Sequence, residues 1–496
     1  MAGNWKPSNV AKLPFFFVDE ESFYLSSVSR ELALPWFFDP LTSEPSVQMG
    51  SKLPKLEEGL GEADRISQLP DEVLTRILSF LDDTVLAVRT MVLSTRWKNL
   101  WKSVSCIRLG DDDYESDDRF MTLADHVVSL HDLTDILRFD LTYVNDGIRD
   151  DMLAADYTCI RKWICTIVQH NVAELHLNLS NFDGTQDPFL FPECLFMSTT
   201  LVDLKVHSDI ISFSNCPIEG CFPSLKALYV SVDESEQDSP SSLENLFCCC
   251  PVLEQLTILG TFSESNITIS APELKTLGMD CSFCDSNAFS INAPKLENFD
   301  LLDNSSVPNT YHFENGRSPI KVKLTLDHDN DDFDADRATA LFAQISNVED
   351  LSLSLKGLTA SYLPEFVNLS RLVLVLHGFN YGEFLIECLT RCPNLKHLIL
   401  ELKDNKWRST DDKLEWEFSN PHQCPACLVS HLQTISIKGF KGQQDEMDVA
   451  QFLLKNGVVL NTMSIHTVSE VSMKEDLLRK LLEYVGSSKS RVILAD

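Results

Sequence analysis

Short leucine-rich phrases recur through the C-terminal two thirds of the chain, each reading L-x-x-L-x-L with conservative replacements. They start at Val172, Leu201, Leu225, Leu253, Leu274, Leu296, Val348, Leu369, Leu395 and Leu432. Subtracting neighbouring starts gives spacings of 21 to 29 residues, with one of 37 and one of 52, where residues 322–326 hold a degraded copy between two periods of 26. A segment this short cannot close a core alone, so successive copies must stack on one another.

The spacing is that of leucine-rich repeats, in which every unit supplies one short parallel strand and a helical or irregular return segment. We therefore expect an α/β solenoid with parallel strands. An ordinary α/β sheet is the weaker alternative, since many return segments hold too few residues for a full helix and two loops. Residues 157–168 have helical spacing and are expected to cap the start of the solenoid. Prolines that fix φ precede several strands, at Pro223, Pro251, Pro272, Pro294 and Pro393.

Residues 64–101 hold three short helical signals in one small unit. Pro70 and the acidic Asp71 and Glu72 favour a helix start, because proline suits the first turn and the helix dipole attracts negative charge. Thr84 and Ser94 are the expected N-caps of the second and third helices. A unit of about 40 residues buries too small a core to need so many apolar side chains, so some of them should contact a partner. The apolar stripe of the first helix is Leu74, Ile77, Leu78 and Leu81.

These residues resemble the F-box of plant proteins. The match rests on Leu69-Pro70, on the apolar stripe, and on a closing Val92-Leu93-Ser94-x-Arg96-Trp97 element in which Thr95 departs from the usual basic residue. The resemblance implies that the helices dock on a Skp-family adaptor and, through it, on a cullin-based ubiquitin ligase. The alternative is that the helices only cap the chain's own core. The adaptor-binding residues that the resemblance indicates are Leu69, Pro70, Leu74, Ile77, Leu78, Leu81 and Trp97.

The C-terminal segment resembles the FBD domain, which follows leucine-rich repeats in many plant F-box proteins. Residues 424–428, 432–442, 445–456 and 459–465 carry the match. Gly457 stands where that family prefers alanine; it weakens a helix end by about 1 kcal/mol but also suits a helix C-terminus. The expected organisation is an irregular extension at 1–60, the F-box at 61–108, an acidic loop and linker at 109–150, leucine-rich repeats at 151–410, and an FBD domain continuing the solenoid at 411–496.

Acidic residues outnumber basic ones, with 74 Asp+Glu against 41 Lys+Arg and a formal net charge of −33. Such a chain repels phosphate backbones and anionic lipids, so we expect no nucleic-acid partner and no membrane. No run approaches the roughly 18 apolar residues of a membrane span, and the first residues lack a basic segment followed by a long apolar core. We therefore expect the nucleus or the cytoplasm, where the 15 cysteines stay thiols.

Motifs for catalysis are absent from the sequence, which has no G-x-x-x-x-G-K-[ST] loop, G-x-S-x-G elbow or H-E-x-x-H pair. We expect no enzyme activity, no cofactor and no metal. Cys281-x-x-Cys284 and Cys424-x-x-Cys427 each have the spacing of half a zinc site, but several repeats separate the two pairs. The cysteines at 248–250 are better interpreted as buried core residues.

Residues that alternate with the core leucines should line the concave face of the solenoid, where a receptor would hold its substrate. They are His176, Lys205, Tyr229, Thr257, Gly278, Asp300, Ser352, Val373, Ile399 and Ser436. The later positions turn apolar, and a contiguous exposed apolar patch usually marks an interaction site. The alternative is that the FBD segment folds over this face. The candidate substrate-binding residues are Tyr229, Val373, Val375 and Ile399.

The combined features predict a substrate-recognition subunit of a Skp–cullin–F-box (SCF-type) ubiquitin ligase, which would bind the adaptor and a protein substrate. A non-ligase interaction scaffold is one alternative. A small-molecule co-receptor, as some F-box repeat proteins are, is another. An anionic polyphosphate would need a basic patch on the repeats, and the acidic sequence shows none.

Overall fold

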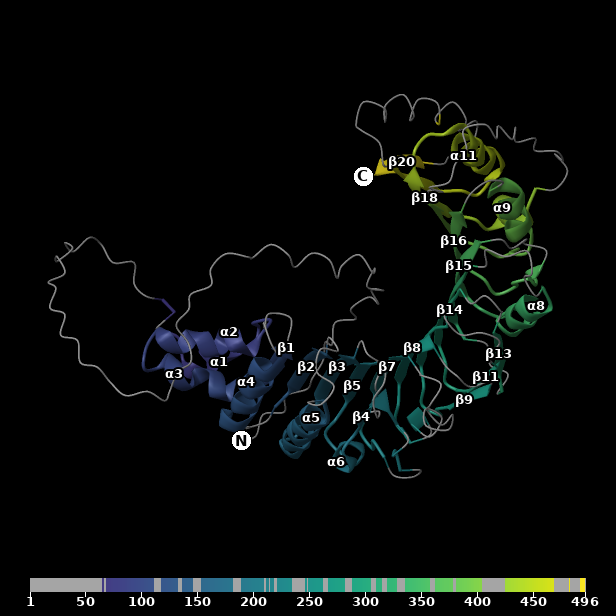
Figure 1. Ribbon diagram of the computed structural model, residues 1–496. Coiled ribbons are helices and arrows are strands. Elements are labelled where there is room, and N and C mark those ends of the chain that lie inside the picture. The colour runs from purple at the N-terminus through teal and green to yellow at the C-terminus, as the bar shows by residue number, and fades with distance from the viewer. Residues whose placement is uncertain are drawn as a thin grey trace, which may run out of the picture. The chain divides into compact units, whose positions relative to one another are not determined.

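One parallel sheet runs through the chain, as expected for an α/β solenoid of leucine-rich repeats (Figure 1). Its strands follow one another in sequence order, so each strand pairs with the strand of the repeat before it and of the repeat after it. They are β1 (Cys106–Gly110), β2 (Arg138–Asn145), β3 (Glu174–Asn181), β5 (Asp203–Ser208), β7 (Ala227–Asp233), β8 (Gln255–Thr261), β10 (Thr276–Asp280), β12 (Asn298–Asp303), β14 (Lys321–Asp327), β15 (Asp350–Lys356), β16 (Arg371–His377), β17 (His397–Lys403), β18 (Thr434–Phe440), β19 (Thr462–Thr467) and β20 (Arg491–Ala495).

The computed structural model describes residues 65–66, 68–110, 117–132, 136–145, 153–181, 189–208, 211–213, 215–217, 221–233, 246–247, 249–261, 266–281, 288–304, 309–314, 319–327, 335–356, 362–377, 381–403, 424–467, 481 and 491–495. The predictions for residues 1–60 and for the acidic run at 111–116 lie outside these residues. Among the described helices, none combines the length and the apolar character that a membrane crossing requires.

A proline turn precedes several strands. Leu225 N–H donates to the Phe222 carbonyl (3.2 Å) across Pro223, and Leu253 N–H donates to the Cys250 carbonyl (3.3 Å) across Pro251. Proline suits the second position of such a turn because its φ is already fixed. Each turn brings the first leucine of the phrase into the core, where Leu225 and Leu253 have no exposed surface. The same hydrogen bond forms before β10, β12 and β17.

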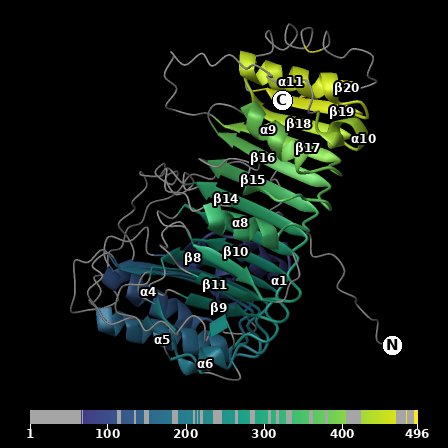
Figure 2. The ribbon, with the colours of Figure 1, turned by 90° about the vertical axis from the view of Figure 1, so that its right-hand side faces the viewer.

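The return segments change character along the chain (Figure 2). Helices α4 (Asp117–Leu130), α5 (Leu153–Gln169) and α6 (Glu193–Phe196) form the early returns, and α8 (Ala335–Gln344), α9 (Tyr381–Thr390), α10 (Ala426–Ser430) and α11 (Gln444–Asn456) form the later ones. In between, β9 (Asn266–Ser270), β11 (Ala288–Asn292) and β13 (Thr310–Phe313) make a second parallel sheet, and β4 (Phe189–Leu190) pairs with β6 (Ile211–Ser212). The expectation of helical or irregular returns therefore missed strands.

The solenoid starts earlier than the sequence pattern predicts. The phrase already occurs at Val104-x-x-Ile107-x-Leu109, which leads into β1, and at Ile136-x-x-Phe139-x-Leu141, which leads into β2. It was missed because the full helices α4 and α5 lengthen these first returns beyond the usual period. The helix predicted at 157–168 is α5, but it lies between β2 and β3 and does not cap the array. Residues 109–150, expected to be loop and linker, contain α4 and β2.

The C-terminal segment continues the main sheet through β18, β19 and β20. The register between β18 and β19 shifts between Ile437 and Phe440, where Gly439 has a positive φ of 74°. Gly457 ends α11, and its N–H donates to the Leu453 carbonyl at 3.0 Å. Its φ of −78° is not left-handed, so the glycine is needed for space: a Cβ there would lie 2.8 Å from the Leu453 oxygen.

Candidate protein-interaction surfaces

Three short helices form the N-terminal module: α1 (Asp71–Leu78), α2 (Thr84–Arg89) and α3 (Trp97–Leu100). The predicted helix start is confirmed, because the Pro70 carbonyl accepts the N–H groups of Val73 and Leu74, each at 3.1 Å. The predicted caps are wrong. Asp83 caps α2 by accepting the Val85 N–H at 2.8 Å, and α3 follows Arg96 with no side-chain cap from Ser94.

The seven residues predicted to bind the adaptor divide between the core and the surface. Leu74, Leu78 and Trp97 are only 0%, 5% and 9% exposed, so they hold the three helices together and offer little surface to another chain. Leu69 and Leu81 are half-buried against the same core. Ile77 and Pro70 are exposed. The stripe splits because Ile77 lies about 100° around the helix axis from Leu78.

A second apolar face of the module points to solvent. Val73, Ile77 and Phe80 follow one another at i, i+4 and i+7, and Phe80 is 73% exposed. Val92 and Leu93, which follow α2, are also exposed, at 71% and 63%. The sequence contained a signal for this second face, because α1 and the turn after it carry apolar residues both on the buried side and on the side of Val73, Ile77 and Phe80. We call this set the outer face; its exposed members are Ile66, Val73, Ile77, Phe80, Leu86, Val92 and Leu93.

Two arginines hold the module in place: Arg96, which belongs to the closing element of the F-box match, and Arg108, which the sequence did not single out. Arg96 donates to the Asp71 carboxylate (2.7 Å) and to the Leu69 carbonyl, which ties the third helix to the start of the first. Arg108 on β1 donates from Nη1 to the carbonyls of Ser79 (2.9 Å) and Leu81 (2.7 Å). The module and the sheet are therefore joined by hydrogen bonds to the end of α1.

The alternating positions of the repeats form one row across the sheet, as predicted. The pairing runs from His176 to Lys205, Tyr229, Thr257, Gly278, Asp300, Lys323, Ser352, Val373, Ile399 and Ser436 without a break. We call the side of the sheet that carries this row the open face. Its regular register makes each repeat contribute side chains to one continuous surface.

The candidate substrate residues fall into two places on the open face. Val373 pairs directly with Ile399, and Val375 lies two residues along the same strand, so these three form one half-buried apolar patch. Tyr229 is half-buried on β7, and five strands separate it from β16, so it does not belong to that patch. The described FBD strands extend the sheet edge beyond this patch; residues 404–423 lie outside the described residues.

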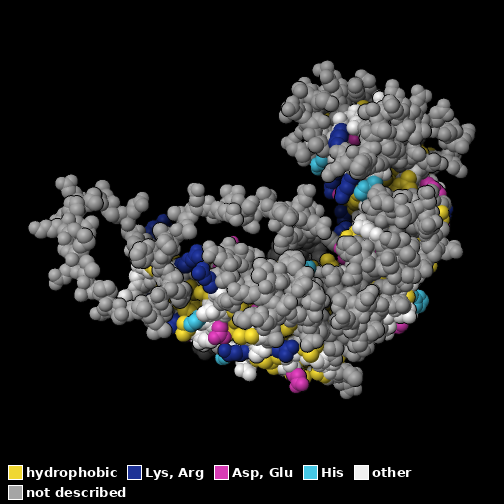
Figure 3. All heavy atoms as spheres, viewed as in Figure 1, with side chains coloured by type: hydrophobic (Ala, Val, Ile, Leu, Met, Phe, Trp, Pro, Cys, Tyr) yellow, Lys and Arg dark blue, Asp and Glu magenta, His cyan; other side chains and the backbone are white. Residues whose placement is uncertain are grey.

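Basic side chains gather around the apolar patch, contrary to the expectation that the repeats have no basic patch (Figure 3). Two acidic side chains are found among the described ones on this face of β14 to β20, Asp350 and Glu401. Each is paired, Arg371 with Asp350 (3.2 Å) and Lys438 with Glu401 (2.8 Å). The exposed cations, which we call the basic group, are Lys321, Lys323, Arg371, Lys403, Lys438 and Arg491. The net charge of the chain concealed this local excess.

Early strands carry a different, more buried polar cluster. Arg138 donates to Asp140 (2.7 Å) and to Nδ1 of His176 (3.0 Å). Burial, followed by the nearby cations of Lys205 and Arg138, lowers the pKa of His176 to about 4. His176 is therefore neutral at neutral pH. We interpret the cluster as a structural hydrogen-bond network at the start of the open face.

The two half zinc sites of the sequence lie on distant repeats. Cys281 is buried at the end of β10, and Cys284 is outside the described residues. Cys427 is buried on α10, whereas Cys424 is exposed just before it. Five strands of the main sheet, β12 to β17, separate the two positions, so the pairs do not share a site.

Comparison with known proteins gives matches to three family models in the same order as the structural modules. A model described as F-box domain matches residues 66–109, one described as "FBD-associated F-box protein At5g56370, LRR repeats" matches residues 160–325, and one described as FBD matches residues 420–465. The F-box match ends on β1.

Similar proteins from Arabidopsis thaliana match this chain over most of their length. "FBD-associated F-box protein At4g10400" is 29% identical over 432 residues, covering 84% of this chain and 96% of the relative. "F-box/FBD/LRR-repeat protein At5g22660" is 27% identical over 454 residues, covering 86% and 95%. "FBD-associated F-box protein At5g27750" is 29% identical over 480 residues, covering 87% and 99%. This chain therefore carries F-box, leucine-rich-repeat and FBD domains in that order, and it is similar over most of its length to FBD-associated F-box proteins of Arabidopsis thaliana.

Proposed function

We propose that this chain is the substrate-recognition subunit of an SCF-type ubiquitin ligase in the nucleus or cytoplasm. The observation that carries the proposal is the outer face of the F-box module, where Phe80, Val92 and Leu93 are each more than 60% exposed. Several large apolar side chains exposed on one small module favour binding to another protein. The partner we propose for this surface is a Skp-family adaptor, which would connect the chain to a cullin.

The open face of the repeats is the second half of the proposal. A protein substrate would bind at the apolar patch of Val373, Val375 and Ile399, and the basic group around it favours a substrate with acidic residues. In this role the chain performs no chemistry itself. Holding the substrate near a ubiquitin-charged enzyme raises the local concentration of the reacting lysine.

Co-purification with a Skp-family adaptor tests the first half. We expect the wild type to retain the adaptor, and Val92→Asp and Leu93→Asp to lose it, because each places a charge in an apolar contact while leaving the module's own core intact. Val458→Asp is the matched control, since Val458 is equally exposed (67%) but lies in the FBD segment. Equal recovery of the adaptor by all these proteins would show that the adaptor does not bind at the outer face. Failure of the wild type to recover it would contradict the adaptor-binding role and favour a scaffold outside the ligase.

Substrate capture tests the second half. Val373→Asp and Ile399→Asp should keep the adaptor but lose the proteins that co-purify specifically with the wild type, quantified by mass spectrometry. Retained adaptor shows that the F-box module is folded, and circular dichroism shows whether the repeats are. If the co-purified proteins are unchanged, the substrate does not bind at this patch.

A further inference from the structure

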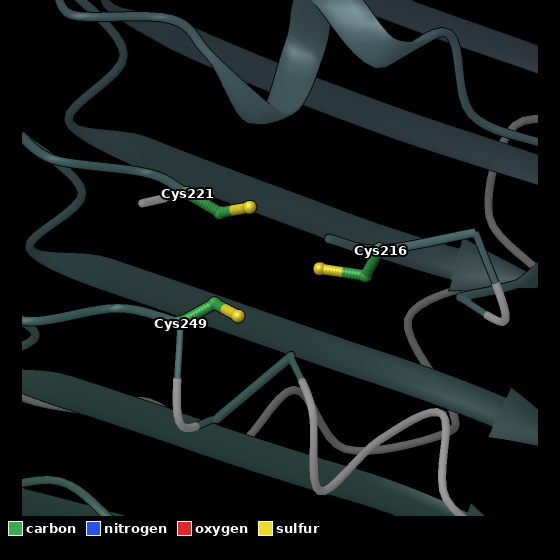
Figure 4. A group of neighbouring side chains, drawn as sticks. All are labelled: Cys216, Cys221 and Cys249. Atoms are coloured by element: carbon green, nitrogen blue, oxygen red, sulfur yellow. The ribbon is translucent and has the colours of Figure 1, made fainter. Parts of the chain in front are cut away.

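Three cysteines from two successive return segments bring their sulfur atoms together inside the solenoid. The Sγ atoms of Cys216, Cys221 and Cys249 all lie within 4.8 Å of one another, and the three side chains are 6%, 0% and 3% exposed. Figure 4 shows the sulfur atoms of Cys221 and Cys249 facing that of Cys216. Neither the F-box surface nor the open face uses this cluster.

A carbonyl oxygen lies beside the three sulfur atoms. The Pro217 oxygen is 2.9 Å from Sγ of Cys249, 3.3 Å from Sγ of Cys221 and 3.7 Å from Sγ of Cys216. The four atoms therefore surround one small volume. Nitrogen ligands are not needed to complete a four-coordinate set here, because the oxygen supplies the fourth corner.

The backbone around the cluster is held by hydrogen bonds that do not involve the thiols. Phe222, directly after Cys221, has a positive φ of 44°, and its N–H donates to the Phe196 carbonyl at 2.7 Å. A bulky residue adopts this conformation only when its surroundings require it. Cys249 N–H donates to the Leu246 carbonyl at 3.2 Å, which fixes the neighbouring return segment. Two of the sulfur atoms are thus positioned by the repeat framework itself.

We propose that Cys216, Cys221 and Cys249 bind one Zn²⁺ ion, with the Pro217 carbonyl oxygen as the fourth ligand. A Zn–S bond of about 2.3 Å in a tetrahedral site requires sulfur atoms about 3.8 Å apart and sulfur–oxygen distances of about 3.5 Å. The three observed sulfur–oxygen distances of 2.9, 3.3 and 3.7 Å lie around the required value, and sulfur atoms within 4.8 Å of one another can reach the required separation by small side-chain rotations. Thiolates are the soft ligands that select zinc and Cu⁺ over hard cations.

Charge favours zinc over Cu⁺ in this buried place. Binding requires all three thiols to lose their protons to solvent, so three thiolates and Zn²⁺ leave one negative charge, whereas three thiolates and Cu⁺ leave two. A larger buried charge costs more free energy.

Metal content of the full-length protein is the first test. Protein expressed in zinc-supplemented medium and purified without chelators should hold about one zinc per chain, measured by plasma mass spectrometry. Removing zinc with a strong chelator should lower the melting temperature. Growth with Co²⁺ should give the thiolate-to-cobalt absorption of several thiolate ligands. A chain that carries neither zinc nor this absorption overturns the proposal, and one equivalent of copper in its place overturns the choice of zinc.

Cysteine variants assign the site. Cys216→Ala and Cys249→Ala should each lose the zinc and the cobalt absorption, while Cys388→Ala should keep both. Cys388 is the matched control because it is 1% exposed on α9 and lies outside the cluster. Circular dichroism establishes that each protein is folded. If Cys216→Ala holds as much zinc as Cys388→Ala, the proposal is contradicted, and the three thiols are only packed together in the core.

Discussion

Arg108 shows how a single residue joins the helical module to the sheet. Besides its bonds to the Ser79 and Leu81 carbonyls, its backbone N–H donates to Oγ1 of Thr84 at 2.7 Å, and its side chain pairs with Asp140 of β2 at 3.2 Å. The last carbonyls of a helix have no partner within the helix, so an outside donor stabilises them. Sequence reasoning could not find this residue, because its partners meet it only in the folded chain.

Replacing Arg108 with methionine should loosen this junction. Two carbonyls lose their donor and Asp140 loses one of its cations, which we expect to lower the free energy of unfolding by about 2–3 kcal/mol. Urea denaturation followed by tryptophan fluorescence measures the loss. Lys98→Met on the exposed side of α3 is the control and should change stability little; an equal effect of both substitutions would contradict the role of Arg108.

His176 should make stability depend on pH. The unfolded chain takes up a proton on this histidine near pH 6.5, whereas the folded chain does so only near pH 4, so its contribution is complete above pH 6.5 and declines as the pH falls toward 4. Between pH 7 and pH 5, the wild type should lose about 1–2 kcal/mol more than His176→Gln. Urea midpoints at the two pH values measure this, with the exposed His431→Gln as control. Parallel curves for wild type and His176→Gln would contradict it.

At the scale of elements, the sequence predicted the repeated strands of the main sheet and missed the elements that differ between repeats, the return strands and the helix caps. The core strands share a local cause, apolar residues at alternate positions, to which a proline turn is added before β7, β8, β10, β12 and β17, and all the predicted strands were found. The middle returns carried a weaker signal: Asn266–Ser270 and Ala288–Asn292 alternate apolar and polar residues, which is strand periodicity. Helix caps were mispredicted because Asp83 and Thr84 are both good caps, and tertiary contacts decide between them.

Gly439 is an element-scale position where the fold requires glycine. Its φ is +74°, and an added Cβ would clash with the Leu402 carbonyl oxygen on β17. Gly439→Ala should therefore destabilise the protein by about 1–3 kcal/mol, measured by urea denaturation. Gly278→Ala is the matched control, because a Cβ there meets only the Thr257 side chain at 3.4 Å. A harmless Gly439→Ala would show that β18 can form without the bulge.

At the scale of the whole molecule, the order of modules, the α/β solenoid and the row of the open face followed from sequence alone, whereas the outer face and the basic group followed only from the coordinates. Which side of α1 faces the core depends on where the sheet lies, so Leu74 and Phe80 could not be told apart by pattern. The basic group was hidden by a net charge of −33, because charge counts do not record which face a residue occupies.

A stacked array should respond locally to damage. Leu301 is fully buried at the centre of β12, so Leu301→Ala is expected to cost about 2–5 kcal/mol. Hydrogen–deuterium exchange should speed up in β10, β12 and β14 and stay unchanged in β3 and β18, since each repeat contacts only its neighbours. Leu130→Ala, on a half-exposed leucine of α4 (51%), is the control. Faster exchange along the entire sheet would indicate one cooperative unit instead.

The strand β1 ends the F-box match and also begins the sheet, so no separate tether intervenes between the two modules. The distance between a protein bound to the helices and a protein bound to the strands is then set by the number of strands between them, which are spaced about 4.8 Å apart. Gaining or losing a repeat upstream of Val373 would lengthen or shorten the distance between the two binding surfaces by one strand spacing at a time.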